Sequence, residues 1–190
     1  MKSNRLVVGF VSLGLMLMLS ACANNSNEKS SDENKKMDHN SMKMEHMEHS
    51  GSGEVPNGLK EKVNPTYKVG SQAIINADHM EGMNGAKATI AGAYVTTAYA
   101  VSYTPTTGGE KVENHKWVIQ EEIMNAGSTS LKPGTQVTLE ADHMEGMKGA
   151  SGTINSAEQT TVYMIDYTPV GAGEKVTNHK WVTESELSSK

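Results

Sequence analysis

Hydrophobic positions divide the chain into three zones. An apolar run, LVVGFVSLGLMLML, occupies residues 6–19, and a polar stretch with almost no branched apolar residues extends from residue 23 to about residue 64. Beyond it, apolar and polar positions alternate in short segments such as QVTLE and YMIDY, and HKWV is a further short segment of this kind. Alternation with a period of two is typical of half-buried strands, so the third zone is predicted to be β. A helical turn is expected only at TESEL, where Thr183 followed by Glu186 fits a capping box.

The third zone contains an internal duplication. With an offset of about 64 residues and no gap, about 28 of the 47 positions from 77 to 123 are identical in the second copy. The matching strings are DHMEGMNGAKATI (78–90) with DHMEGMKGASGTI (142–154), and YTPTTGGEKVENHKWV (103–118) with YTPVGAGEKVTNHKWV (167–182). A fixed period of this kind is the signature of a repeated structural unit. We therefore expect a first β unit at residues 65–124, a linker at 125–130 and a second β unit at 131–190.

Several short strands within about 55 residues predict a small, strongly bent sheet in each unit. A strand after a glycine, a loop of the form xGMxGAxGxI and then another strand resemble SH3-like barrels of the KOW type. The expected fold is all-β, with two tandem small SH3-like (KOW-type) barrels after a disordered N-terminal tether; an OB-like or open sheet is the alternative. Trp117 and Trp181, at equivalent places in the two units, are expected to anchor the cores, with ligand stacking as the other interpretation.

The N-terminus has the order of a secretory signal peptide, expected at residues 1–21. Basic MKSNR precedes the apolar run, which is short for a bilayer-spanning helix. LSAC at 19–22 resembles a bacterial lipobox, and this resemblance implies cleavage before Cys22, a lipid on that cysteine and a place on the extracellular face of the cell membrane. A plain spanning anchor with an incidental cysteine is the alternative. If the sole cysteine carries a lipid, methionine and histidine remain as the soft and borderline metal ligands.

Residues 22–64 are expected to form a disordered tether, because so polar a segment cannot bury enough apolar surface to offset its ordering entropy. SGSGEVPNG at 50–58 is expected to act as a flexible linker within it. The stretch MDHNSMKMEHMEH concentrates candidate metal ligands, namely Met37, His39, Met42, Met44, His46, Met47 and His49. A merely soluble linker is the alternative, but linkers favour serine, glycine, lysine and glutamate over methionine.

Ligands of these types favour copper(I), a soft ion that selects thioether and imidazole over carboxylate oxygen. A thioether has no proton to lose, so it binds even where thiols and imidazoles are protonated. Silver(I) shares these preferences, and the sequence does not separate the two ions. Zinc, held by histidine with Asp78, Glu81, Asp142 and Glu145, is an alternative that leaves the excess of methionine unexplained. The formal net charge of −5 argues against nucleic acid as a partner.

The repeated DHMEGM and NHKW strings supply a second group of candidate ligands. Adjacent side chains of a strand point to opposite faces, so His79 is expected to pair with Met83, across Gly82, more readily than with Met80. A third donor is expected from NHKW of the same unit. The two sets are His79, Met80, Met83 and His115 in the first unit, and His143, Met144, Met147 and His179 in the second. The alternatives are that one methionine of each loop packs in the core and that the histidine caps a turn.

The lipobox, the Met/His-rich tether and tandem ADHMEGMxGA…YTP…GEKVxNHKWV units resemble the CopL/YdhK family of bacterial surface lipoproteins. The resemblance covers nearly the whole mature chain. It implies an extracellular, membrane-attached protein that binds copper(I) and helps the cell to tolerate copper excess, often alongside a copper-exporting ATPase. The residues onto which it carries metal-ligand character are His79, Met80, Met83, His143, Met144 and Met147.

A cell-surface interaction module that binds peptide or cell-wall glycan is the alternative function, since pairs of SH3-like domains commonly do so. Such a module needs an exposed groove, and the candidates to line it are Tyr94, Tyr99, Tyr103, Tyr163 and Tyr167. An enzyme is not expected. No Ser-His-Asp or Cys-His constellation is legible, and a multicopper oxidase needs cysteine ligands that the mature chain does not offer.

Overall fold

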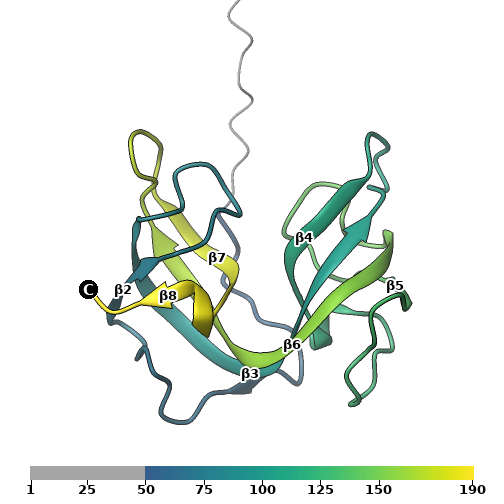
Figure 1. The fold of residues 1–190 in the computed structure, drawn as a ribbon, viewed down its shortest axis with the longest axis horizontal. Helices are drawn as coiled ribbons and strands as arrows, with labels where there is room; N and C mark the ends of the chain where they lie inside the picture. The colour runs from purple at the N-terminus through teal and green to yellow at the C-terminus, as the bar shows by residue number, and fades with distance from the viewer. Residues whose placement is uncertain (1–49) are drawn as a thin grey trace, which may run out of the picture. The chain divides into compact units, whose positions relative to one another are not determined.

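The computed structural model of the chain describes residues 50–190 (Figure 1). These residues form eight strands and two 3₁₀ turns, which confirms the predicted all-β class. The strands are β1 (Lys60–Glu61), β2 (Gln72–Ile75), β3 (Lys87–Tyr103), β4 (Val112–Ile119), β5 (Gln136–Thr138), β6 (Ser151–Tyr167), β7 (Val176–Thr183) and β8 (Leu187–Ser188), and the turns are η1 (Gln120–Glu122) and η2 (Glu184–Glu186). Among residues 50–190, no helix is long and apolar enough to cross a membrane.

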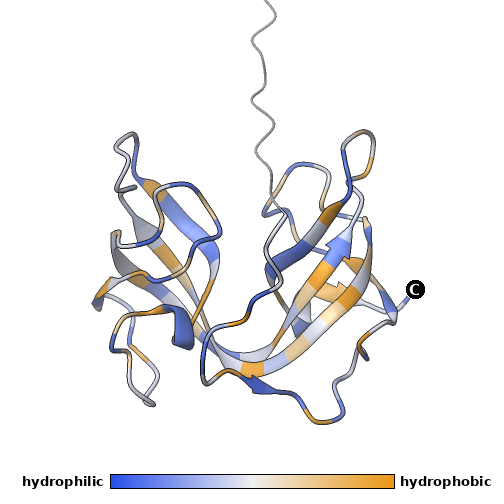
Figure 2. Ribbon diagram, turned by 180° about the vertical axis from the view of Figure 1, so that it is seen from behind, coloured by the Kyte–Doolittle hydropathy of each residue, from blue (hydrophilic) through white to orange (hydrophobic). Residues whose placement is uncertain are grey.

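Strands β3 and β6 dominate the fold, because they run antiparallel to each other along almost their full 17-residue lengths. Ala88 lies opposite Tyr167 at one end of this ladder, and Tyr103 lies opposite Gly152 at the other. Both strands contain many β-branched and aromatic residues, which fit a pleated surface, and apolar positions recur along them (Figure 2). Through this ladder the strands of both repeats join one eight-stranded sheet.

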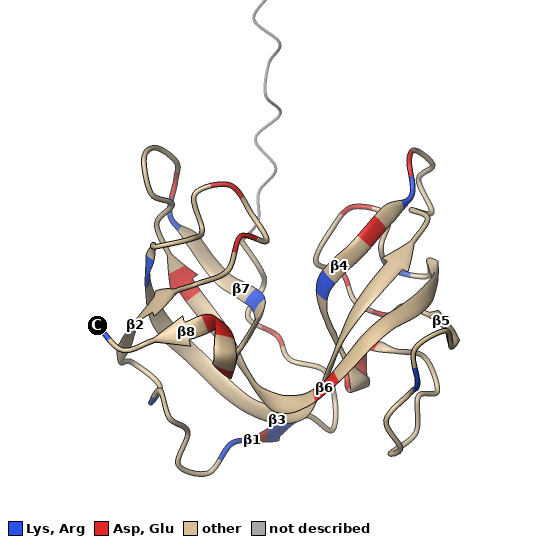
Figure 3. Ribbon diagram, viewed as in Figure 1, with Lys and Arg blue, Asp and Glu red and all other residues tan. Residues whose placement is uncertain are grey.

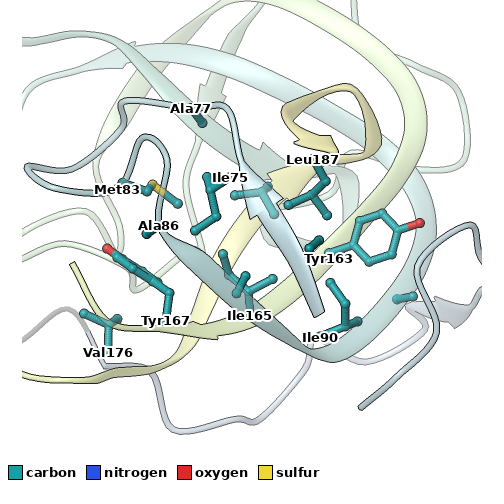
Figure 4. Close-up of a cluster of buried hydrophobic side chains, with 14 residues drawn as sticks. Ile75, Ala77, Met83, Ala86, Ile90, Tyr163, Ile165, Tyr167, Val176 and Leu187 are labelled. Carbon is teal, nitrogen blue, oxygen red and sulfur yellow. The ribbon is translucent and has the colours of Figure 1, made fainter. Parts of the chain in front are cut away.

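Two lobes form at the two ends of the β3–β6 ladder, and each takes strands from both repeats. Lobe A contains β2, the first half of β3, the second half of β6, β7 and β8; lobe B contains the second half of β3, β4, β5 and the first half of β6. The core of lobe A (Figure 4) is formed by Ala73, Ile75, Ala77, Met83, Ala86, Ala88, Ile90, Ala93, Tyr163, Ile165, Tyr167, Val176, Val182 and Leu187. The core of lobe B is formed by Tyr99, Val101, Tyr103, Val118, Ile123, Leu139, Ala141, Met147, Ala150 and Ile154. The predicted units at 65–124 and 131–190 are therefore repeats in the sequence but do not fold separately. Each lobe is built from half of one repeat and half of the other.

The exchange of halves follows from the length of the two central strands. A strand rises about 3.3 Å per residue, so 17 residues span about 55 Å, more than one small core can cover. Turn residues follow only at the ends of β3 and β6, where Thr-Pro occurs at 104–105 and 168–169. Because β3 has no turn in its middle, its second half cannot fold back onto its own repeat and instead enters the other lobe.

Trp117 and Trp181 pack where the two lobes join, in a cluster that also contains Tyr94, Ile119 and Met164. The two indoles are 6% and 0% exposed, so their predicted burial is confirmed, but both belong to this cluster and not to the core of either lobe. Tyr94 meets Trp181 edge to face, with ring centroids 5.7 Å apart. Truncating a buried tryptophan of this kind to alanine costs about 3–5 kcal/mol of stability.

Residues 50–64 are held against the sheet, which corrects the expectation of a disordered tether that extends to residue 64 and of a flexible linker at 50–58. The Gly51 N–H donates to the Thr177 carbonyl at 2.8 Å, and the Thr177 N–H donates to the Ser50 hydroxyl at 3.1 Å. Further on, β1 pairs with the middle of β3. This polar segment is ordered because neighbouring strands satisfy its backbone groups. The expected signal peptide (1–21), the lipidation site Cys22 and the tether ligands Met37, His39, Met42, Met44, His46, Met47 and His49 lie outside the described residues.

Candidate metal centre

A cleft of about 1390 Å³ is lined by residues of both lobes. Its walls include the Asp-His-Met strings of both DHMEGM loops, the Asn-His-Lys strings of β4 and β7, and parts of residues 50–57. Acidic and basic residues are interspersed over the strands and loops (Figure 3). Within the cleft, however, eight carboxylates face three lysines: Glu54, Asp78, Glu113, Glu121, Glu122, Glu140, Asp142 and Glu145 against Lys116, Lys148 and Lys180. Such an excess of negative charge favours the entry of cations.

His143 is fixed in the cleft by a carboxylate from the other repeat. Its Nε2 lies 2.7 Å from Glu122 Oε1, and the two side chains are 9% and 6% exposed. The second oxygen of Glu122 accepts hydrogen bonds from Trp181 Nε1 at 3.0 Å and from the Ile119 N–H at 3.2 Å. Three donors therefore converge on one buried carboxylate, which holds the imidazole ring in a single orientation.

His79 has the equivalent arrangement, again with partners across the repeats. Its Nε2 lies 2.8 Å from Glu186 Oε1, and Glu186 Oε2 accepts from Trp117 Nε1 at 2.8 Å and from the Thr183 N–H at 2.9 Å. Burial by itself raises the pKa of Glu186, but the hydrogen bonds from His79, Thr183 and Trp117 outweigh it and hold this pKa at about 2. Glu186 is therefore a carboxylate at neutral pH. The turn expected from Thr183 and Glu186 is present as η2.

The two carboxylates determine which ring nitrogen of each histidine is available to a metal. A carboxylate only accepts hydrogen bonds, so Nε2 of each neutral imidazole carries the proton and Nδ1 carries the lone pair. In both His79 and His143, Nδ1 is buried and has no hydrogen-bond partner. Metal-ligating histidines characteristically donate their other N–H to a carboxylate, and the arrangement found here has that form.

His115 brings a third imidazole to the cleft. Its Nε2 is also buried without a partner, and its ring lies 6.4 Å from that of His143, centroid to centroid. Burial, and next to it the charges of His143 and His79, lower the pKa of His115 to about 4. The ring is therefore neutral at physiological pH, which is the form that binds metals. His179 lines the same cleft and meets Tyr167 edge to face at 5.7 Å.

The four methionines of the repeated loops occupy two kinds of place. Met80 and Met144 are half-buried and line the cleft. Met83 and Met147 are fully buried in the cores of lobes A and B. The alternative in which one methionine of each loop packs in the core therefore describes Met83 and Met147. The expected pairing of His79 with Met83 is not formed, because the loop turns the Met83 side chain inward among Ile75 and Ala86 (Figure 4).

The third donor was expected from the same repeat, and the structure changes this pairing. Besides Tyr103, the ring of His115 contacts that of His143 from the second repeat, because the strand exchange places β4 in the lobe that holds the second DHMEGM loop. Among residues 50–190, no three His, Cys, Asp or Glu side chains are grouped so as to hold a metal ion. Asp78, Glu81, Asp142 and Glu145, the carboxylates considered for zinc, are exposed.

Glu122 was missed as a site residue by the sequence analysis, and Glu186 was identified only as a capping residue. Glu122 and Glu186 are 64 positions apart, the same repeat offset that relates His79 to His143. This shared offset is the signal that could have placed them beside the histidines. The five tyrosines considered for a peptide or glycan groove are all buried, with exposed fractions between 0% and 8%: Tyr94, Tyr99, Tyr103, Tyr163 and Tyr167.

Fold and site together define a small all-β protein of two strand-exchanged repeats, with histidine–carboxylate pairs on the DHMEGM loops of a shared cleft. The chain belongs to the DUF1541 family, described as a protein of unknown function, whose model matches twice, at residues 69–120 and 133–184. The two matches confirm the duplication predicted from the sequence.

Comparisons with known proteins agree with this assignment. The chain is 60% identical to "Uncharacterized protein YdhK" of Bacillus subtilis (strain 168) over 190 residues, which cover 100% of this chain and 92% of that protein. A crystal structure of YdhK from Bacillus subtilis matches with a TM-score of 0.74 and 68% identity, covering 77% of this chain and 99% of that one. A solution NMR structure of the YdhK C-terminal domain matches with a TM-score of 0.62 and 69% identity, covering 65% and 93%. The resemblance to YdhK noted in the sequence is thus confirmed.

Proposed function

We propose that this protein is an extracellular lipoprotein, anchored in the cell membrane through a lipid on Cys22, that binds copper(I) through methionine and histidine and contributes to copper tolerance by sequestration. The observation that supports this most strongly is the pair of unpartnered, buried Nδ1 atoms of His79 and His143, each on a ring whose Nε2 is held by a carboxylate. A copper-exporting ATPase is the partner that the family resemblance implies.

The donor set of the cleft favours copper(I) over zinc. Structural zinc sites take four ligands, and no three His, Cys, Asp or Glu side chains are grouped to hold a metal among residues 50–190. Copper(I) accepts fewer donors and selects imidazole and thioether, which the cleft offers in His143 with Met144 and in His79 with Met80. Silver(I) has the same preferences and serves as a probe of the same donors.

The rest of the proposal is supported by the sequence. The Leu-Ser-Ala-Cys string ending at Cys22 supports export and lipidation, and the methionine and histidine density of residues 37–49 supports capture of a soft ion outside the cytoplasm. Binding rather than catalysis is proposed, because the side chains that distinguish the cleft are of metal-ligand types and the sequence has no recognisable Ser-His-Asp or Cys-His pattern of nucleophilic catalysis. Sequestration then follows from the number of donors that one chain offers.

The test is an anaerobic titration of the chain from Ala23 onward with copper(I), in competition with a chromophoric copper(I) chelator. We expect the protein to withdraw copper(I) from the chelator and zinc, the control ion, to be bound more weakly. Deleting residues 37–49 should lower the copper stoichiometry while the circular dichroism spectrum of the β region is unchanged. A folded chain that leaves all copper(I) with the chelator rules the proposal out.

Two methionines of one loop provide a matched pair of variants for the same titration. Met144 lines the cleft, whereas Met147 is buried in the core of lobe B. Met144→Leu should weaken copper(I) binding and leave stability nearly unchanged. Met147→Leu should cost less than about 1.5 kcal/mol of stability, as volume-conserving core substitutions do, and leave copper(I) binding unchanged.

A further inference from the structure

Three buried ring nitrogens of the cleft lack a hydrogen-bond partner: His79 Nδ1, His115 Nε2 and His143 Nδ1. Buried polar atoms are nearly always paired, so three exceptions gathered in one cleft indicate a ligand. His115 is the member of the three that does not come from a DHMEGM loop. Its position relative to His79 and His143 therefore decides with which of these two histidines it can share a metal ion.

The distance between His115 and His143 fits a single bridging ion. Their ring centroids lie 6.4 Å apart. An imidazole nitrogen lies about 1.1 Å from its ring centroid and binds a metal at about 2.0 Å, so an ion held linearly between two rings places their centroids about 6 Å apart. The distance between the two ring centroids is therefore close to the spacing that a two-coordinate ion requires.

His79 has a different neighbour. Its ring contact is with Trp117, at a centroid distance of 6.4 Å and an interplanar angle of 76°. Trp117 donates its indole N–H to Glu186, the carboxylate that also bonds His79. Trp117 therefore helps to hold the imidazole ring of His79 in place. The imidazole that faces His115 in a ring contact is that of His143, which belongs to the other repeat.

We infer that the copper(I) site of the cleft joins the two repeats, with Nδ1 of His143 from the second repeat and Nε2 of His115 from the first bound linearly to the same ion, and with the Met144 thioether as a weaker additional donor beside this pair. This inference rests on the proposed function and specifies its site. Met144 follows His143 directly in the chain, lines the same cleft and packs against the core of lobe B. A nitrogen, nitrogen and thioether set suits a soft monovalent ion.

The direct test is long-range ¹H–¹⁵N NMR of histidine side chains in the soluble chain from Ala23 onward, during anaerobic addition of copper(I), with silver(I) as a second probe. As the cleft fills, the ¹⁵N signals of His143 Nδ1 and His115 Nε2 should move together away from the position of an unprotonated imidazole nitrogen. His143 Nε2, bonded to Glu122, should keep its proton. Histidines of residues 37–49 give separate signals, so binding by the tether is recognised as such.

Affinity measurements give an independent second test. His143→Gln and His115→Gln should each lower the copper(I) affinity of the cleft site at least 10-fold. The double variant should lose about as much affinity as the weaker-binding single variant and no more, because both substitutions remove the same site. His79→Gln is the matched control from the equivalent position of the first repeat. Combined with His115→Gln, it should add a further loss of copper(I) uptake, because the two substitutions remove donors from different loops' sites.

The outcomes separate this inference from the proposed function. If His115 Nε2 does not respond, or if it responds together with His79 Nδ1 while His143 is unchanged, the cross-repeat site is wrong although the protein still binds copper(I). If the wild-type chain takes up no copper(I) at all, the proposed function fails. The NMR result does not depend on any variant, so a substitution that prevents folding leaves the test intact.

Discussion

Thr96 lies directly opposite Thr160 in the β3–β6 ladder, and the two are equivalent residues of the two repeats, 64 positions apart. An antiparallel ladder in which a residue pairs with its own equivalent has a local twofold axis at that pair. The chain is thus built like a homodimer whose two subunits have been joined covalently. Two contacts between the repeats, His79 with Glu186 and His143 with Glu122, are counterparts of each other across this axis.

This relationship predicts the behaviour of a single repeat. A fragment of residues 50–126 lacks half of each lobe, so as a monomer it exposes the β3 face that covers both cores. We expect it to be unfolded at low concentration and to form a dimer with the two-lobed architecture at high concentration. Size-exclusion chromatography with light scattering and circular dichroism across a dilution series measures both. A fragment that is folded and monomeric at all concentrations would contradict the role given to the strand exchange.

Glu122→Gln is expected to weaken copper(I) binding about 10- to 100-fold, because the carboxylate orients His143 and fixes its tautomer. The three donors that converge on Glu122 need two accepting oxygens, and an amide offers one, so one donor is left unsatisfied at a cost of about 1–3 kcal/mol. Chelator competition and urea unfolding measure the two effects. Glu140→Gln is the control, since Glu140 lines the same cleft and is exposed.

Two glycines of one loop are predicted to differ in their tolerance of alanine. Gly146 has φ +71°, and an added Cβ would lie 2.6 Å from Thr107 Oγ1 and 3.0 Å from Pro105 Cβ; Gly149 has φ +80°, and its nearest such neighbour is 4.0 Å away. Gly149→Ala should therefore lose about 1–2 kcal/mol, the cost of a left-handed non-glycine residue, and Gly146→Ala clearly more. Urea midpoints of the two variants compare them. Equal losses would show that the DHMEGM loop is free to move away from the loop of the other repeat.

Tyr163 predicts a pH effect on stability in the alkaline range. Burial, helped by the neighbouring Glu184, raises the pKa of Tyr163 to about 12, whereas the phenol of an unfolded chain ionises near pH 10. Between these pH values the folded state binds more protons than the unfolded state, so the free energy of unfolding falls as the pH rises. In Tyr163→Phe this fall should be smaller between pH 10 and pH 12.

Urea unfolding at pH 9, 10 and 11 measures the effect of Tyr163. The variant also removes the bond from the tyrosine hydroxyl to Glu184 at 2.9 Å, so it is expected to be less stable than wild type at pH 9. The prediction concerns the slope with pH and not this offset. An identical pH slope in both proteins would mean that Tyr163 titrates as an ordinary exposed tyrosine.

Several features of the site can be predicted from the sequence alone. The DHMEGM and NHKW strings recur at one offset, and both bring histidines to the cleft. The partners of these histidines could not be predicted from the sequence, because which residues meet each histidine depends on how β3 and β6 cross between the lobes. The same-repeat grouping of His79 with His115 assumed that each repeat folds onto itself. Whether it does depends on a turn in the middle of a 17-residue strand, and local alternation does not reveal the absence of that turn.

The sequence alone determined the β class, the duplication, the buried role of both tryptophans and the kinds of donor that the repeated loops carry. Periodicity and residue chemistry are local properties, so they can be read from neighbouring positions in the chain. The tertiary structure alone decided that Met83 and Met147 face the cores, that Glu122 holds His143, and that His115 faces His143. These are contacts between segments far apart in sequence, and they are set by how the long strands cross between the lobes.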